Sequence, residues 1–325
     1  MEFKVDNSLK QEYLESKPTK TATSDAFVLR SADDFEDIID KKIYDMSYSE
    51  LDQMLAMQFK NSSRQSNSKN ISILKNYIDF CIDKNIVLHG ENRLATFTSE
   101  KAKEFVSKSA MTNKYISKEK LREYQNILYN EQDKLLLELL FVGVRGRTTI
   151  DGTLEEVINL KIDDVDVENN MLKLTHNNGD IRFLEVETST VKLIQETFEQ
   201  GFYVENNGEI TNNPRVPNPR KTIVNEFDNL VFRIPGKNKY NKFNPNLLNS
   251  RMKKIQKILD NMYITYTSLY MSGMIDMAMN MLKEKECLKK EDYIFICNRY
   301  AYGSEPEKYW FQIKALIEEY LELTQ

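Results

Sequence analysis

The sequence has few of the residues that build metal sites and disulfide scaffolds. Among its 325 residues are three cysteines and two histidines. The cysteines, Cys81, Cys287 and Cys297, show no metal-ligand spacing, and the histidines, His89 and His176, are far from one another in the sequence. We therefore expect no metal ion, no other cofactor and no disulfide framework, and the free thiols are typical of a reducing cytosol.

Long apolar runs are also absent. No apolar stretch reaches the length of a membrane-spanning helix, and the polar residues 1–13 lack the apolar centre of a signal peptide. The net charge is −5, so the overall charge balance does not indicate a nucleic-acid partner. We expect a cytoplasmic protein with no membrane partner.

What is present favours helices. Apolar residues make up 41% of the chain and charged residues 29%, with 10 glycines and 7 prolines, which suits two helix-rich domains of ordinary size. The pattern predicts a polar, poorly ordered segment over residues 1–32, a helical domain over 33–112 and a larger domain over 113–325. Ser47 and Glu50 have the spacing of a capping box and predict the start of a helix.

A buried helix that ends near an arginine lies at the centre of the larger domain. The apolar run 135–142 predicts the helix, and Gly143-Val144-Arg145 predicts its end. A cation at the end of a buried helix is costly unless an anion meets it. Arg145 therefore either binds a phosphate or forms an internal salt bridge. The acids that follow are the candidate partners for such a bridge: Asp163, Asp164 and Asp166.

A hairpin follows this helix in the sequence. Alternating apolar residues flank Asn177-Asn178-Gly179-Asp180, which is a strong signal for two antiparallel strands joined by a tight turn. We expect a mainly α-helical fold with this small antiparallel β hairpin or sheet.

Positive charge is concentrated in one segment of this otherwise acidic chain. Residues 213–257 contain eleven Lys and Arg residues and two acids, a local charge of +9. An amphipathic helix in this segment is predicted to bury Met252, Ile255, Ile258 and Leu259 and to expose Lys253, Lys254 and Lys257. Such a face indicates a polyanionic partner, and an ordinary solvated face is the alternative.

Arg64, Lys69 and Lys75 surround another helix start, which either holds a phosphate or is an ordinary cap.

The order of these pieces resembles the tyrosine recombinase (phage integrase) family. A small helical domain precedes YISKEKL at residues 115–121, the helix that ends in Gly143-Val144-Arg145, and LEEVINLKIDDVDVENNMLKL at 154–174. The resemblance covers about residues 45–325 and is closest to the recombinase-like lysogeny repressors of SPβ-type Bacillus prophages. It implies a two-domain clamp around DNA, with a helical core-binding-like (SAM-like) domain and a catalytic-like domain.

The catalytic residues of that family are largely missing. Its members cleave DNA with a tyrosine, and two arginines, a lysine and usually two histidines surround the phosphate. Arg145 matches the first arginine, but the predicted hairpin turn has no lysine. The best match to the family's His-x-x-Arg motif has Thr267 and Tyr270 at those positions, and no histidine follows His176. The candidates for a nucleophile are Tyr300, Tyr302 and Tyr309.

The resemblance thus implies a non-catalytic, sequence-specific double-stranded DNA-binding protein that represses transcription and maintains prophage lysogeny. We expect the DNA backbone to be held by Arg145, Arg147, Lys237, Lys239, Lys253, Lys254 and Lys257. The candidates for base reading are Arg64, Lys69 and Arg251. The alternative is an active site-specific recombinase with a diverged site, indicated only by Arg299 beside Tyr300. An antagonist protein or peptide could dock on the carboxy-terminal helices, and the last helix could pass to a neighbouring subunit or fold back on its own chain.

Overall fold

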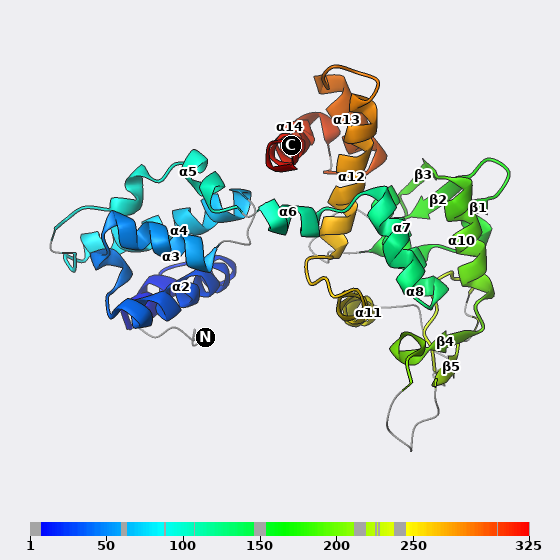
Figure 1. Ribbon diagram of the computed structural model, residues 1–325, viewed down its shortest axis with the longest axis horizontal. Helices are drawn as coiled ribbons and strands as arrows, with labels where there is room; N and C mark the ends of the chain where they lie inside the picture. The colour runs from blue at the N-terminus through cyan, green and yellow to red at the C-terminus, as the bar shows by residue number, and fades with distance from the viewer. Residues whose placement is uncertain are drawn as a thin grey trace. The chain divides into compact units, whose positions relative to one another are not determined.

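The chain folds into two compact units, residues 1–111 and 112–325 (Figure 1). The boundary that the sequence pattern predicts, between residues 112 and 113, lies one residue further along the chain. The computed structural model describes residues 8–59, 64–87, 89–106, 108–145, 154–210, 219–224, 226, 228–236, 245–303 and 305–324.

The amino-terminal unit is a set of helices around one apolar core. Its helices are α1 (Ser8–Glu15), α2 (Thr19–Ile39), α3 (Tyr48–Gln58), α4 (Arg64–Asp83) and α5 (Ser99–Glu104), with 3-10 turns at Ile43–Asp45 and Arg93–Thr96. Helix α4 packs against α1, α2 and α5, because its apolar residues recur every three or four positions. Leu74, Ile78 and Cys81 lie on that face and are buried. Helix α6 (Lys108–Lys114) spans the division between the units.

The expectation of a poorly ordered segment over residues 1–32 is wrong for the part that the structure describes. Helices α1 and α2 bury Tyr13, Leu14 and Leu29 in the core of this unit. Lys10 is fully buried as well, with its ammonium 2.5 Å from Asp33 Oδ1 and 3.0 Å from a Glu36 carboxylate oxygen. The apolar stripe was hard to see in the sequence because alanines and a buried ion pair occupy several of its positions.

The capping box at the start of α3 is confirmed. Ser47 Oγ accepts a hydrogen bond from the Glu50 N–H at 3.3 Å, and the Glu50 carboxylate accepts one from the Ser47 N–H at 2.6 Å. The bond from the Ser47 N–H, followed by that from the Lys41 ammonium, holds the pKa of Glu50 at about 2. Since the folded pKa is lowered, this contribution to stability is present above the ordinary pKa of glutamate and is lost as the pH falls toward 2.

We predict that Ser47→Ala lowers the free energy of unfolding of this unit by about 1 kcal/mol, because the helix loses its N-cap acceptor. Urea denaturation of the full chain measures the change. Ser31→Ala is the matched control, because the half-buried Ser31 lies inside α2 and its hydroxyl donates to the Phe27 carbonyl of the same helix. Equal effects of the two substitutions would contradict the prediction.

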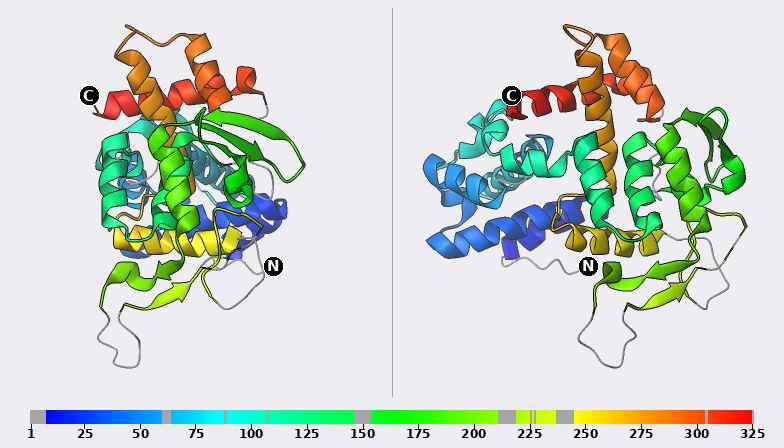
Figure 2. Two further views of the ribbon diagram at one scale, coloured as in Figure 1. Left: turned by 90° about the vertical axis from the view of Figure 1, so that its right-hand side faces the viewer. Right: turned by 45° about the vertical axis from the view of Figure 1, so that its right-hand side comes forward.

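The carboxy-terminal unit is built around α8 (Glu131–Val142). Leu136, Leu139 and Leu140 are fully buried, because α7 (Lys118–Ile127), α10 (Thr188–Glu199) and α12 (Tyr266–Leu282) pack against α8 (Figure 2). The other helices of this unit are α9 (Glu155–Asn159), α11 (Pro245–Ile258), α13 (Lys290–Arg299) and α14 (Pro306–Thr324), with 3-10 turns at Ile162–Asp164 and Glu205–Gly208.

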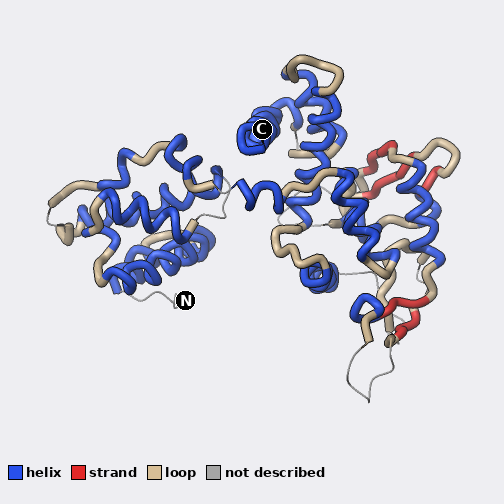
Figure 3. Tube along the Cα trace, viewed as in Figure 1, coloured by secondary structure: helices blue, strands red, loops and turns tan. Residues whose placement is uncertain are grey.

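Two small antiparallel sheets complete this unit (Figure 3). The strands β1 (Val165–Asp166), β2 (Met171–Thr175) and β3 (Ile181–Glu185) form one sheet in that order, and β4 (Phe202–Val204) pairs with β5 (Lys221–Ile223). In the hairpin Thr175 pairs with Ile181, and Gly179 in the turn has a φ of 90°. The predicted hairpin and the predicted fold class, mainly α with a small antiparallel sheet, are both confirmed.

The last helix folds back on its own chain. Helix α14 packs against α13 and α12, and it buries Ile313 and Ile317. The Tyr320 ring also meets the Tyr115 ring edge-on, with 6.4 Å between the ring centres. Across the ranges described, no helix is both long and apolar enough to cross a membrane.

Candidate nucleic-acid interface

A glycine at the end of α8 sets the position of Arg145. Gly143 has φ 103° and ψ 15°, and its N–H donates to the carbonyl oxygens of Leu139 and Leu140. Residues with a side chain rarely adopt this left-handed conformation. A Cβ at this position would also lie 3.0 Å from the Tyr300 ring. The helix therefore stops at Gly143, and the chain turns to present Arg145.

The Arg145 side chain is half-buried and has neutral neighbours. Its Nη2 donates to Thr267 Oγ1 at 3.2 Å, and its guanidinium lies over the Tyr270 ring, 5.2 Å from the ring centre. Its backbone N–H donates to Glu156 Oε2 at 2.8 Å. Burial lowers the pKa of Arg145. No carboxylate of the described residues lies within 4 Å of this guanidinium in an ion pair, so its remaining donors can meet an external anion.

The acids that were candidate partners of Arg145 are bonded elsewhere. Asp163 accepts a hydrogen bond from Asn229 Nδ2 at 2.7 Å. Asp164 lies 3.6 Å from the Lys173 ammonium, and Asp166 accepts from Asn169 Nδ2 at 2.7 Å. These acids stabilise the 3-10 turn and the start of the sheet, and the phosphate-binding interpretation of Arg145 gains weight.

The structure brings Thr267 and Tyr270 to Arg145, as the resemblance implies for the family's histidine and second arginine. Both side chains are uncharged. The Tyr270 hydroxyl donates to the Tyr300 carbonyl oxygen, and burial raises the pKa of Tyr270 while Arg182 and Arg145 oppose the shift. Neither residue adds a cation for the charge that develops on phosphorus during cleavage.

The hairpin turn does not supply a free cation either. His176, at its start, is buried between two carboxylates, with Nδ1 2.9 Å from Glu155 and Nε2 3.2 Å from Glu156. Both ring nitrogens are thus engaged inside the protein. The residues that follow, Asn177-Asn178-Gly179-Asp180, have no cationic side chain.

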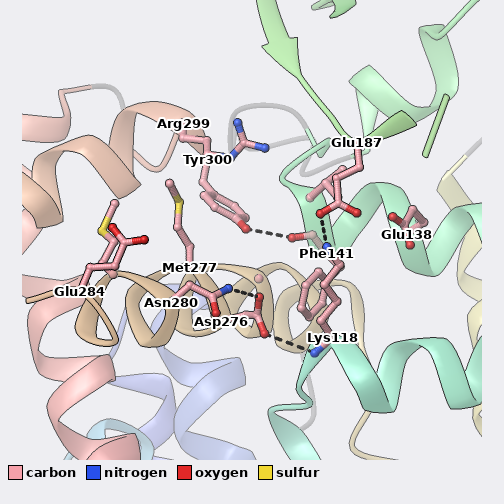
Figure 4. A pocket seen from close by; sticks show the side chains of 13 residues that line it. Lys118, Glu138, Phe141, Glu187, Asp276, Met277, Asn280, Glu284, Arg299 and Tyr300 are labelled. Carbon is pink, nitrogen blue, oxygen red and sulfur yellow. Dashed lines mark hydrogen bonds and ion pairs between the residues drawn. The ribbon is translucent and has the colours of Figure 1, made fainter. Parts of the chain in front are cut away.

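Two of the three candidate nucleophiles, Tyr300 and Tyr302, have their hydroxyls hydrogen bonded within the protein. The Tyr300 ring is 3% exposed at one wall of a cavity between α8 and α12, and its hydroxyl donates to the Phe141 carbonyl at 3.0 Å (Figure 4). The Tyr302 hydroxyl donates to Gln312 Oε1 at 3.0 Å. Burial raises the pKa of both hydroxyls. Tyr309 packs edge-on against Tyr302 with 6.5 Å between the ring centres.

Two family models match the chain. Residues 115–324 match the model described as "MrpR, C-terminal catalytic domain", and residues 4–83 match "MrpR, N-terminal core-binding domain". The chain belongs to the MrpR family. Its two domain types are those implied by the resemblance to tyrosine recombinases, which is thereby confirmed at the level of fold.

A prophage protein is similar to this MrpR-family chain. The SPbeta prophage-derived uncharacterized protein YopR of Bacillus subtilis (strain 168) is 23% identical over 203 residues, which is 62% of this chain and 61% of YopR. The match thus spans less than two thirds of the relative's length. This MrpR-family chain is a recombinase-like protein of the SPβ type.

Two solved recombinase structures are similar to this chain, with a lower sequence identity than YopR. The structure of XerA recombinase has 16% identity and a TM-score of 0.40, over 98% of this chain and 99% of that one. The Tn1549 transposon integrase, in complex with a circular intermediate DNA, has 12% identity and a TM-score of 0.44, over 96% of the MrpR-family chain and 93% of the integrase.

The basic helix of the MrpR-family chain has the predicted faces. Lys253, Lys254 and Lys257 are exposed on α11, and Met252 and Ile255 are buried beneath them.

In the amino-terminal unit, Arg64 forms an ion pair with Glu100, and the Lys69 ammonium donates to Ser24 Oγ at 2.8 Å. Three other candidates lie outside the described residues: Arg147, Lys237 and Lys239.

The prediction that Arg251 reads bases is wrong. Arg251 is 6% exposed on the inner face of α11, where its Nε lies 3.4 Å from Asp133 Oδ1 and its Nη1 donates to Gln132 Oε1 at 3.0 Å. Its guanidinium also lies over the Tyr203 ring, 4.8 Å from the centre. Arg251 follows Leu248 by one helical turn, so it faces the core with the apolar residues, and the buried Asp133 compensates its charge.

The sequence analysis did not single out Glu156 or Arg182. Glu156 is fully buried on α9, and its carboxylate accepts a hydrogen bond from the Arg145 backbone N–H. Arg182, on β3, donates a further hydrogen bond to the same carboxylate. The available signal was weak: Glu156 stands in an amphipathic turn, and Arg182 occupies a strand position whose neighbours alternate between core and solvent.

Proposed function

We propose that this protein binds double-stranded DNA at specific sequences without cleaving it, and that it acts as a repressor that maintains prophage lysogeny. The observation that carries the proposal is the Arg145 guanidinium, held by Thr267 and Tyr270 and without a carboxylate partner among the described residues. A guanidinium in this state can donate paired hydrogen bonds to a phosphate. The similarity to a prophage-derived protein supports the link to a prophage.

The residues around Arg145 favour binding over cleavage. Cleavage needs several cations on the phosphate and an ionisable nucleophile, whereas Thr267 and Tyr270 are neutral, and the Tyr300 hydroxyl is bonded to a backbone carbonyl. We therefore expect Arg145 and the exposed lysines of α11 to contact DNA phosphates. These contacts would bind the DNA without promoting cleavage.

We predict that the triple variant Lys253→Gln, Lys254→Gln, Lys257→Gln has a shallower salt dependence of DNA binding. Each lost phosphate contact reduces the log–log slope by about 0.9, so the slope falls by up to about 2.7. Fluorescence anisotropy with a labelled mixed-sequence duplex at several salt concentrations measures it. The control triple variant Lys192→Gln, Lys308→Gln, Lys314→Gln changes the net charge equally on α10 and α14. The same loss in both variants would argue against α11 as the contact surface.

Genome-wide footprinting in the host tests the repressor role. Binding sites clustered in the promoters of one prophage, with those genes expressed when the protein is removed, are the expected result. A single site that resembles an attachment sequence, without any change in transcription, would favour a recombinase instead.

A further inference from the structure

Glu156 is a buried anion beside the candidate phosphate-binding site. Its side chain has no exposed surface. Oε2 accepts the Arg145 backbone N–H at 2.8 Å and Arg182 Nη2 at 2.7 Å. Oε1 accepts Arg182 Nε at 2.5 Å and lies 3.2 Å from His176 Nε2. A carboxylate buried to this extent requires a cation, because its desolvation would otherwise cost several kcal/mol.

Arg182 is the cation that meets this need. Besides its two bonds to Glu156, its Nη2 donates to the Gly143 carbonyl at 2.6 Å and its Nη1 to the Arg299 carbonyl at 3.0 Å. Every nitrogen of this guanidinium is thus hydrogen bonded within the protein, and the side chain is 18% exposed. Arg182 joins the end of α8, the short helix α9 and the end of α13.

Two arginines therefore bond to one buried carboxylate, Arg182 through its guanidinium and Arg145 through its backbone N–H. Arg182 occupies both Glu156 oxygens, and the Arg145 side chain points instead to Thr267 and Tyr270. If Glu156 lost Arg182, two groups that already contact it could take the place of Arg182: the His176 ring, whose Nε2 lies 3.2 Å from Oε1, and Arg145, which is bonded to Oε2 through its backbone N–H.

We propose that Arg182 is a positioning residue: by neutralising Glu156 in a two-point ion pair, it keeps the Arg145 guanidinium available for a DNA phosphate. This inference rests on the proposed DNA-binding function, but it makes a claim about Arg145 that can be measured without DNA. Arg182→Gln should redirect the Arg145 side chain to Glu156. The double variant Arg182→Gln, Glu156→Gln removes both charges and should release it.

The first test measures the reactivity of each arginine toward p-hydroxyphenylglyoxal by peptide mass spectrometry on the full chain. Arg251, which is paired with Asp133, serves as the internal reference for a sequestered arginine. Arg182→Gln should slow the labelling of Arg145 several-fold, toward the rate of Arg251, and the double variant should restore it. Unchanged labelling in Arg182→Gln, or equal slowing in both variants, would overturn the proposal.

A further variant covers the case in which Arg182→Gln does not fold. Arg182→Lys keeps the charge but cannot form the two-point pair. It should slow the labelling of Arg145 partly, and the absence of any slowing in a folded Arg182→Lys protein counts against the proposal.

The second test uses a mixed-sequence 30-base-pair duplex. It measures the salt slope, which is the slope of the logarithm of the binding constant against the logarithm of the salt concentration. Arg182→Gln should lower the slope by about 0.9, as one lost phosphate contact does, and should lower it no further in an Arg145→Ala background. A further fall in that background would mean that Arg182 itself contacts phosphate, which overturns the positioning role. If the wild-type protein does not bind the duplex, the proposed function fails, and the labelling experiment still decides the role of Arg182.

Discussion

Replacement of Arg145 by alanine is expected to weaken binding to duplex DNA at least about tenfold. A hydrogen bond to a charged group contributes about 1.5–3 kcal/mol, and 1.4 kcal/mol corresponds to a factor of ten in affinity. The loss should be large because the half-buried guanidinium is already held by Thr267 and Tyr270, so little conformational entropy is lost on binding. The salt slope should fall by about 0.9 at the same time.

Fluorescence anisotropy on the labelled duplex measures both quantities, with thermal unfolding recorded for each variant. Lys192→Ala is the matched control, because Lys192 is a 75% exposed cation of the same unit that is paired with Glu196 on its own helix. Arg145→Lys should recover the charge but only part of the affinity, since an ammonium cannot form the two-pronged contact. Wild-type affinity in a folded Arg145→Ala protein would remove Arg145 from the interface.

Gly273→Ala is expected to destabilise the carboxy-terminal unit by about 3 kcal/mol or more. A Cβ at this position would lie 1.7 Å from the Phe141 carbonyl oxygen and 2.5 Å from the Tyr300 hydroxyl. The first of these atoms belongs to the backbone of α8, so α12 would have to move away from the buried centre of the unit. Overpacking of this kind costs about 1–3 kcal/mol and occasionally more.

The sign of the effect makes this prediction decisive. In a helix without a close neighbour, a change from glycine to alanine stabilises by about 1 kcal/mol. Guanidinium denaturation of the full chain should instead show a large loss for Gly273→Ala. Gly201→Ala is the control, since no atom of the described residues other than its chain neighbours would lie within 4 Å of the new Cβ, and it should stay within about 0.5 kcal/mol of the wild type. Stabilisation by Gly273→Ala would mean that α8 and α12 do not meet as described.

Local signals in the sequence predicted the elements that depend on neighbouring residues. The capping box at Ser47 and Glu50 is formed by residues three positions apart. The hairpin around Asn178 and Gly179 needs only a turn and two alternating strands. The exposure of Lys253, Lys254 and Lys257 and the burial of Met252 and Ile255 on α11 follow from helical periodicity, and these features were predicted correctly.

Features that depend on distant partners were missed. Lys10 is polar in the sequence but fully buried, because Asp33 and Glu36 of the next helix pair with it. The sequence pattern around Arg251 predicts a base-reading surface residue, because its buried partner, Asp133, is more than a hundred positions away. No pattern in the sequence indicates such pairs, since each is formed only when two helices pack.

The status of Arg145 also depended on contacts that only the fold provides. The sequence left an internal salt bridge open, with the acids that follow it as candidate partners. In the structure, Asp163 bonds to Asn229 and Asp164 lies near Lys173. The buried carboxylate of Glu156 pairs with Arg182 and not with the Arg145 guanidinium. The sequence predicts an arginine at the end of a buried helix. It does not predict that Glu156 is the carboxylate beside that arginine.

The central claim is that the protein holds a DNA phosphate without cleaving the strand. The most direct test is a nicked suicide substrate built on a footprinted binding site and incubated with the wild-type protein, followed by a denaturing gel. We predict that all of the DNA runs free of protein. A covalent protein–DNA adduct that disappears in Tyr300→Phe, Tyr302→Phe or Tyr309→Phe would contradict the claim and identify an active recombinase.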